Sequence, residues 1–596
     1  MDRSSITKWL LLGLALFLFW QYGRKAIGLA PATNEHQPIV LLADATAPAE
    51  RSPEEMCRIE TGNFAADLST RGASLRHFVL KNGNYYQTND KDPYDRTGKM
   101  DLVTTPTSEA RMPLRTDLRS PAAAVPQQQT PFDDVDWKLA THDGTSCTFT
   151  HVDDTTSLTK IVRFTGKPYE LEVDLKVQNL ATEPKKHRLT FEQTGYIKKK
   201  DIEGGFMRRQ SEHATETMAS AGEKTEKQGP SDFDPDNFKK KEFTTEGWRR
   251  TPGDARFIAV NTSYFSKLAI PLERPAGLAA PAAETRIEDI WNPIFVERAK
   301  DPELGHIYRA RLAYPEKELK QGETAEYKVL TFNGPKERDL LKAVDPIATD
   351  VLNLGMFAII GKLLVTYLTW LFHLTGSWGV AIILMTITVK TALFPLSLTQ
   401  IKSSIAMRKL KPEMDALNEK YKDDATQRGL ATQELWKKNG ITNPVLGCLP
   451  MLLQMPVWWA LYSALQTAIE LYHVPFGPFI PDLSAPGKYF IIPIVLGASS
   501  FIQQRMMPAQ GDAQQQKMMM YMMPAVFTFM MLFLPAGLGV YMMTNTWLGI
   551  AQQFLVEKYQ KAKASSPGTI EVREKTEGGG GKPTATLGKG KARVRG

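Results

Sequence analysis

The sequence predicts a multi-domain protein in which a polar, all-β domain precedes an α-helical polytopic membrane bundle. The chain has 596 residues, 42% hydrophobic and 23% charged, an average that resembles a soluble protein. The charges are unevenly distributed, because the segment from Ile441 to Val556 contains only Glu470, Asp482, Lys488, Arg505, Asp512 and Lys517. A soluble domain of this size could not cover its surface with so few charges. The second part of the chain is therefore expected to lie in lipid.

Residues 1–25 predict an N-terminal signal-anchor span. An apolar run from Trp9 to Trp20 has two basic residues on each side, so local charge alone does not orient it. No A-x-A cleavage site follows, which favours an anchor that is retained. Residues 26–50 are rich in Pro, Ala and polar residues and predict a linker.

Residues 51–344 predict an all-β domain. Apolar and polar residues alternate over ten positions from Tyr169 to Gln178, as in a half-buried antiparallel strand. Several shorter runs bounded by turn residues favour a β sandwich. Lys198–Lys241 has low hydrophobicity and is expected to be a mobile loop. The shorter runs are Ser146–His151, Phe257–Val260 and Glu326–Phe332.

Two of the three cysteines, Cys57 and Cys147, fall in this β domain. They could pair if the domain lies outside the cytoplasm, but two cysteines provide no spacing pattern to test. Their pairing stays open at this point.

Beyond residue 345 the pattern is helical. Residues 345–377 predict an amphipathic helix at the membrane interface, since apolar residues at helical spacing share the segment with Lys362 and His373. Residues 378–556 predict a five-span core with a charged helical hairpin at 401–440, so the anchor brings the total to six spans. The five spans are about Trp378–Leu398, Leu446–Leu471, Tyr489–Gln504, Met520–Leu534 and Leu538–Val556.

Basic residues orient this bundle. Nine Lys/Arg lie in 401–440 and ten in the tail 557–596, whereas the loop Leu471–Lys488 has one. The hairpin and the basic tail are therefore expected in the cytoplasm. With six spans, both termini are expected in the cytoplasm and the β domain in the periplasm. The protein as a whole is then expected in the inner membrane of a Gram-negative cell.

No motif indicates an enzyme, a metal or a cofactor. The nine histidines form no H-x-H or H-E-x-x-H pattern, and no dinucleotide fingerprint or G-x-S-x-G elbow occurs. We therefore expect no catalytic residue, no metal site and no cofactor.

The candidate site centres on Lys390, which falls inside a predicted span. A cation in the hydrocarbon region costs about 2.5–3.5 kcal/mol on insertion scales, so Lys390 is expected to face a polar cavity. Thr386, one turn earlier, lies on the same face. Two alternatives stay open: Lys390 could snorkel to the cytoplasmic interface, and the polar residues of the other spans could serve as helix–helix contacts. These polar residues are Gln454, Gln503, Gln504, Thr544, Asn545, Gln552 and Gln553.

Several motifs of the helical part resemble the YidC/Oxa/Alb family of membrane protein insertases. They are Leu446–Tyr462 (LGCLPMLLQMPVWWALY), Gly376–Gly379 (GSWG), Lys390–Leu396 (KTALFPL) and Pro535–Gly537 (PAG) followed by Tyr541 and Asn545. The segment Ser69–Gly72 (STRG) and the pair Tyr264 and Phe265 are similar to the β-supersandwich periplasmic domain of Gram-negative members.

This resemblance implies an insertase with a hydrophilic groove open to the cytoplasm and the lipid. Thr386 and Tyr541 align with groove residues that contact substrate, and a positive residue attracts the polar part of the substrate. Most bacterial members have arginine where this chain has Lys390, which keeps the charge but not the forked geometry. The expected groove residues are Lys390, Thr386, Tyr541, Gln454 and Asn545.

The resemblance also implies partners. They are nascent membrane proteins, the Sec translocon (SecYEG and SecDF), membrane lipid, and the ribosome, which would contact the basic tail and the hairpin. Two other functions stay open from the residues: a small-solute transporter, against which no internal repeat is visible, and a membrane-anchored carbohydrate-binding or mutarotase-like protein, for which the histidines show no grouping.

Overall fold

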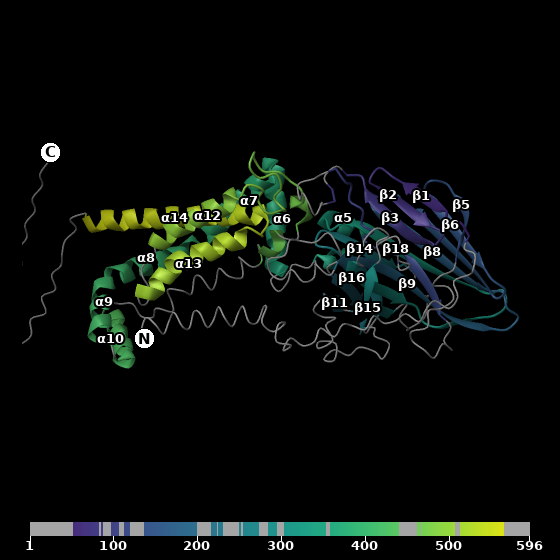
Figure 1. Cartoon of the computed structure of the whole chain (residues 1–596), viewed down its shortest axis with the longest axis horizontal. Coiled ribbons are helices and arrows are strands. Elements are labelled where there is room, and N and C mark those ends of the chain that lie inside the picture. The colour runs from purple at the N-terminus through teal and green to yellow at the C-terminus, as the bar shows by residue number, and fades with distance from the viewer. Residues whose placement is uncertain are drawn as a thin grey trace, which may run out of the picture.

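The structure is a computed structural model with an all-β domain at one end and a helical domain at the other (Figure 1). It describes residues 52–82, 85–87, 97–105, 112–119, 136–198, 216–222, 224–229, 249–251, 254–272, 284–294, 303–352, 358–422, 424–439, 460, 462–465, 468–506 and 513–565.

The β domain contains three antiparallel sheets. The smallest has the order β1 (Met56–Glu60), β2 (Phe64–Ser69), β3 (Ser74–Leu80). The largest has the order β11 (Lys224–Gln228), β10 (Glu216–Ala221), β13 (Ala255–Asn261), β14 (Phe265–Pro271), β18 (Thr324–Pro335), β8 (Glu170–Asn179), β7 (Thr156–Phe164), β6 (Ser146–Val152), β5 (Lys138–His142). The third has the order β12 (Arg249–Thr251), β15 (Glu284–Ile294), β16 (Glu303–Ala313), β9 (Lys185–Lys198), β17 (Lys317–Leu319), and β4 (Arg115–Arg119) also pairs with β9.

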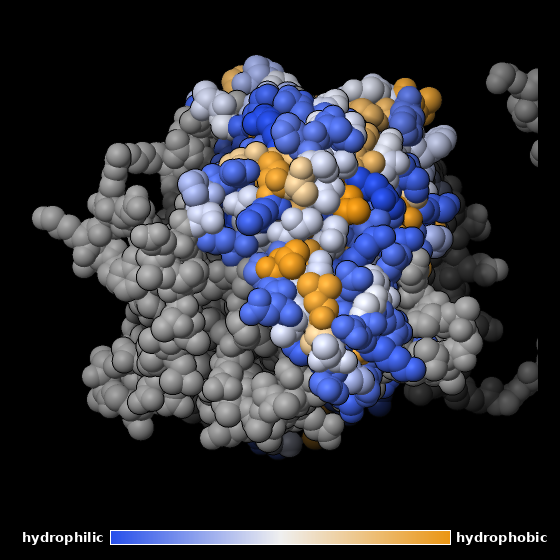
Figure 2. Space-filling view, turned by 90° about the vertical axis from the view of Figure 1, so that its right-hand side faces the viewer, coloured by the Kyte–Doolittle hydropathy of each residue, from blue (hydrophilic) through white to orange (hydrophobic). Residues whose placement is uncertain are grey.

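The two larger sheets form a sandwich, as predicted. Strands β10, β13 and β14 of the larger sheet contact β9, β15 and β16 of the other. The hydrophobic core of the domain includes Phe191, Phe257, Tyr308 and Phe332, all of them buried. The end of the domain seen in Figure 2 is mainly hydrophilic with scattered apolar side chains, as expected for a domain that faces water.

The alternation in the sequence identified the central strand correctly. In β8, Leu171, Val173, Leu175 and Val177 are buried, and the strand lies between β18 and β7.

The prediction of a mobile loop at Lys198–Lys241 is wrong in part. Strands β10 and β11 form a hairpin within it, and every residue of β10 is buried. Small residues such as Ala219 and Ser220 lack the hydrophobicity that marks a strand in sequence. They fit because β10 pairs with β13 and packs beneath β15 and β16.

Cys57 and Cys147 form a disulfide. Their Cα atoms are 6.1 Å apart, and the bond joins β1 of the smallest sheet to β6 of the largest. The pairing of the two cysteines, which the sequence left open, is therefore settled by the packing of these two sheets. Disulfides are typical of a compartment outside the cytoplasm.

The β domain continues into the helical domain through α5 (Arg338–Val344) and the 3-10 helix η5 (Pro346–Val351). Helix α6 (Ala358–Thr375) lies across the end of the other helices that faces the β domain (Figure 1). The other helices whose bounds lie in the described part of the chain are α7 (Trp378–Ala392), α8 (Phe394–Lys409), α9 (Lys411–Lys420), α10 (Ala425–Lys438), the 3-10 helix η7 (Ile469–Leu471), α12 (Ile491–Met506), α13 (Ala513–Met531) and α14 (Ala536–Ser565).

The segment predicted as one span, Trp378–Leu398, is two helices. Helix α7 ends at Ala392, Leu393 lies between the helices, and α8 begins at Phe394 with Pro395 in its first turn. Proline has no N–H to continue the hydrogen bonding of a preceding helix, so it favours a new start here. In the described part of the chain, every helix falls short of a membrane crossing in either its length or its apolar character.

Several sequence-based predictions concern residues outside those described. These are the anchor at 1–25, the linker at 26–50, most of the span at Leu446–Leu471 with Gln454, and the tail beyond residue 565.

Candidate functional site: the seam between helices α7 and α14

The first turns of helices α7 and α14 both contact one loop, residues 473–485. Gly379 in the first turn of α7 lies against the ring of Phe476, so closely that a Cβ atom at this position would overlap the ring. At the start of α14, the backbone N–H of Gly537 donates a hydrogen bond of 2.8 Å to the carbonyl of Leu483. Since both helices start from the same loop and contact each other, they run parallel.

A buried pair fixes this loop. His473 Nδ1 lies 2.9 Å from Asp482 Oδ2, and the side chains are 2% and 1% exposed. The other oxygen of Asp482 accepts hydrogen bonds of 2.7 Å from the backbone N–H and the hydroxyl of Ser484. Burial opposes ionisation of Asp482, but His473 and Ser484 outweigh it and lower the pKa of this carboxyl. The charged carboxylate thus holds both sides of the loop.

The register of the two helices follows from their first contact. A Cβ atom on Gly537 of α14 would lie 3.7 Å from Cδ1 of Ile382 on α7. One turn further along each helix stand Thr386 and Tyr541, which are 2% and 3% exposed. The hydroxyl of Thr386 donates 2.7 Å to the carbonyl of Ile382 in its own helix. These two predicted site residues therefore lie at the same height in the interface.

Another turn along, Lys390 on α7 reaches the height of Asn545 on α14. Both side chains are half-buried. Within the described residues, the Lys390 ammonium has no hydrogen bond and no ion pair, so no carboxylate neutralises it. Thr386, Lys390, Tyr541 and Asn545 are hereafter called the seam.

Two other polar residues singled out in the sequence, Gln503 and Gln553, lie where α12 contacts α14. Nε2 of Gln503 on α12 would be 2.7 Å from a Cβ on Gly549, and Gln553 donates to the carbonyl of Met506. The Thr544 hydroxyl donates 2.8 Å to the carbonyl of Val540. Gln503 and Gln553 thus join α12 to α14, in line with the helix–helix alternative. Gln454 is outside the described residues.

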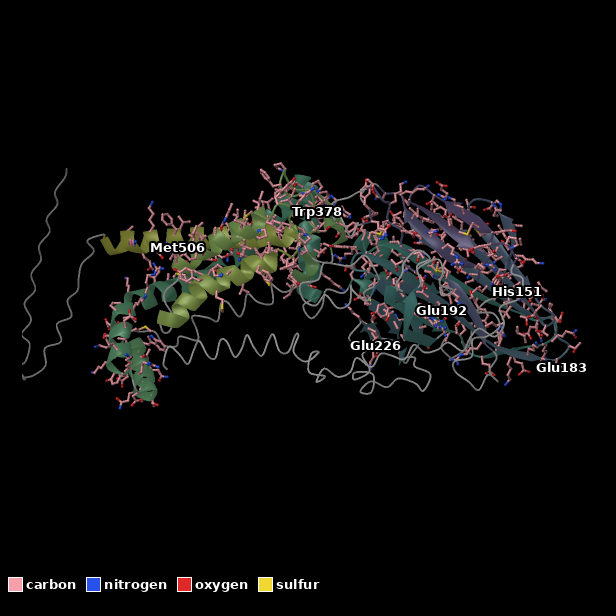
Figure 3. All side chains as sticks on the ribbon, viewed as in Figure 1. His151, Glu183, Glu192, Glu226, Trp378 and Met506 are labelled. Atoms are coloured by element: carbon pink, nitrogen blue, oxygen red, sulfur yellow. A yellow bond between two sulfur atoms is a disulfide. The ribbon has the colours of Figure 1, made fainter. Side chains whose placement is uncertain are left out.

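The sequence did not reveal the ion pair that closes the opposite end of the helical domain. Arg408 of α8 lies 3.0 Å from Glu557 of α14, and it also donates to the carbonyl of Met506 at the end of α12. In Figure 3, Met506 lies away from the β domain, whereas Trp378 at the start of α7 lies beside it. No sequence signal links residues 408 and 557, because the contact depends on the tertiary arrangement of three helices.

Several helices of the helical domain expose large apolar side chains. The following apolar side chains on these helices are more than half exposed: Leu363, Trp370, Leu374, Ile494, Ile502, Tyr521, Val526, Phe529, Trp547, Phe554 and Leu555. Such extended exposure marks a surface that contacts lipid or protein. The fold and the seam therefore define a membrane-associated protein with a water-facing β domain.

Comparison with known proteins agrees with this class. The family described as 60Kd inner membrane protein matches residues 370–563, and the YidC periplasmic domain matches residues 56–367. A membrane protein insertase YidC of Anaeromyxobacter dehalogenans is 33% identical over 522 residues, 86% of each chain. That of Geobacter sulfurreducens is 43% identical over 247 residues, 41% of this chain and 46% of the relative. A solved YidC insertase structure covers 89% of this chain and 98% of its own at 19% identity, with a TM-score of 0.34.

The chain belongs to the YidC family of membrane protein insertases. It is accordingly an inner-membrane insertase, and residues 56–367 form its periplasmic domain. Of the three functions considered from the sequence, membership of this family selects insertion.

Proposed function

We propose that the seam, together with Gln454, lines a groove through which hydrophilic segments of nascent membrane proteins cross the bilayer. The observation that carries this proposal is Lys390, a half-buried cation without a carboxylate partner among the described residues. Such a cation can attract an acidic or polar segment of a substrate, because no internal carboxylate competes. The apolar helix of the substrate then partitions into lipid, and no bond is made or broken.

We further propose a topology of six spans with both termini in the cytoplasm. The nine Lys/Arg of residues 401–440 and the ten of residues 557–596 support this orientation. Helices α9 and α10 of the hairpin would then recruit substrates on the cytoplasmic side. The basic tail would contact the ribosome, through an attraction that weakens with salt. Cooperation with the Sec translocon, through SecYEG and SecDF, is part of the same proposal.

The seam is tested by replacing a host's insertase with this chain carrying Lys390→Arg, Lys390→Ala or Lys390→Glu. We expect insertion of test substrates to persist in Lys390→Arg, which keeps the charge, and to be lost or clearly impaired in Lys390→Glu. Lys185→Glu, an equal change at an exposed position of the β domain, is the matched control. Equal insertion by all three Lys390 variants would remove this residue from the mechanism.

Contact with the substrate is tested separately by a photo-crosslinking amino acid at Asn545. We expect crosslinks to a stalled nascent membrane protein from this position. A crosslinker at Phe554, which is 59% exposed on the same helix and outside the seam, should give few. A higher yield from Phe554 than from Asn545 would contradict the proposed groove.

A further inference from the structure

A cavity of about 260 Å³ lies where the β domain meets the helical domain. Its walls come from Lys336 directly after β18, from α5, η5 and α6, and from Ala464, Ala468 and Glu470. Five charged side chains line it: Lys336, Arg338, Lys342, Lys362 and Glu470. Four cations thus face one carboxylate, which makes the cavity positively charged.

Among the described residues, most of this positive charge has no ion-pair partner. Lys336 is 7% exposed and lies 3.7 Å from Glu216, which offsets its charge. Arg338 donates a hydrogen bond to the neutral hydroxyl of Thr366 on α6. Lys342 and Lys362 are exposed, and neither has an ion pair among the described residues. Three exposed cations, Arg338, Lys342 and Lys362, therefore remain beside Glu470, on which the carboxylates of Glu337 and Asp339 also act.

The cavity adjoins an apolar surface. Val365, Ala464 and Ala468 form part of its wall. Elsewhere on α6, Leu363, Trp370 and Leu374 are 69%, 57% and 68% exposed. A ligand that carries both an anionic group and a hydrocarbon chain would satisfy both surfaces at once.

The size of the cavity limits the occupant. Pockets for drug-sized ligands measure about 300–1,000 Å³, so this one suits a smaller group, comparable to glycerol phosphate. We propose that the cavity binds the headgroup of an anionic phospholipid from the outer leaflet, with Lys342, Lys362 and Arg338 around the phosphate. The acyl chains would lie along the exposed apolar side chains of α6. This inference rests on the proposed topology, which puts α6 at the periplasmic surface of the inner membrane.

The test uses the purified full chain in detergent micelles and counts bound lipid by native mass spectrometry. We expect phosphatidylglycerol to be retained in preference to phosphatidylcholine, whose ammonium group meets a positive site. The double variant Lys342→Gln, Lys362→Gln should lower retention of phosphatidylglycerol about tenfold, because two charge-assisted contacts are lost. The matched control is Lys437→Gln, Lys438→Gln, which removes two exposed lysines of α10 and should change nothing.

The variant Glu470→Gln should change the affinity for the lipid in the opposite direction. Removing the one carboxylate of the cavity should raise the affinity for phosphatidylglycerol, a gain that misfolding cannot produce. Equal retention by the wild type, the lysine variant and the control would overturn the proposal. So would inorganic phosphate alone, if it raised the melting temperature as strongly as the lipid, since the site would then bind free phosphate. Lys390 variants should retain the lipid fully, so failure of the groove and failure of this site are distinguishable.

Discussion

The Tyr472 hydroxyl donates a hydrogen bond of 2.8 Å to the backbone carbonyl of Tyr86, joining residues 386 positions apart. The Tyr472 ring is 4% exposed and packs against Tyr264 and Phe265, with ring centroids 4.7 and 5.6 Å away. Tyr472 adjoins η7 of the helical domain but is part of the hydrophobic core of the β domain. One side chain thus anchors the loop that starts α7 and α14 to the periplasmic domain.

Replacing this anchor should weaken the connection between the two domains in two steps. Tyr472→Phe removes only the hydrogen bond and should cost about 1 kcal/mol, whereas Tyr472→Ala also empties an aromatic cluster and should cost about 3–5 kcal/mol. Limited trypsin digestion of the segment that links the domains should accelerate in the same order. Tyr489→Ala, at a residue that is 56% exposed, is the control. Digestion of Tyr472→Ala at the wild-type rate would refute this role.

The core of the β domain contains a carboxylate between two arginines. Glu192 on β9 is fully buried, accepts 2.7 Å from Arg309 and contacts Arg311, both on β16. Glu192→Gln removes the buried carboxylate that both guanidinium groups contact and should destabilise the fold by about 3–5 kcal/mol. Glu183→Gln, an exposed change in the same domain (Figure 3), should leave the melting temperature unchanged. Similar melting of both variants would show that the buried charge is compensated elsewhere.

Stability should rise with pH between about 7 and 10 because of buried lysines. Burial lowers the pKa of Lys160, and likewise of Lys267, to about 7. In this range the unfolded chain binds protons that the folded chain does not, so each group adds up to about 1.4 kcal/mol per pH unit. Lys160→Met should flatten the slope of melting temperature against pH, and the exposed Lys185→Met should not. An unchanged slope in Lys160→Met would contradict the assignment.

The contact between Gly379 and Phe476 should tolerate no side chain. Gly379→Ala places a methyl group in the Phe476 ring, so the loop or α7 must shift, and we expect reduced insertion and a lower melting temperature. Adding Phe476→Leu should restore part of both. Gly429→Ala in α10 meets nothing within 4 Å and should be neutral or stabilising by about 0.5–1 kcal/mol. Wild-type insertion by Gly379→Ala would show that the loop adapts without cost.

The sequence predicted those parts of the fold that depend on local pattern. Alternation identified β8, and scarcity of charge identified the segments that form α12, α13 and α14. It missed β10, whose small residues are buried by neighbouring strands rather than by their own hydrophobicity. The sequence also predicted one helix where α7 and α8 are found. Apolar residues continue past Leu393, although Pro395 lies in the first turn of a new helix.

The candidate site divides in the same way. Lys390 and Thr386 share a face through helical spacing, which the sequence contains. Their pairing with Asn545 and Tyr541 requires a register between two helices more than a hundred residues apart, which contacts at Gly379 and Gly537 determine. That information lies in loop packing, for which no periodicity exists.

The common origin of α7 and α14 limits how they can separate. Because both helices are held at the 473–485 loop, a separation of the two would be a rotation about that point, which would also strain the Arg408–Glu557 contact between α8 and α14. Displacement at the height of Lys390 and Asn545 must therefore exceed that at Thr386 and Tyr541. In the proposed groove, a substrate segment would meet a wedge that is widest on the cytoplasmic side, with the cation at the wide part.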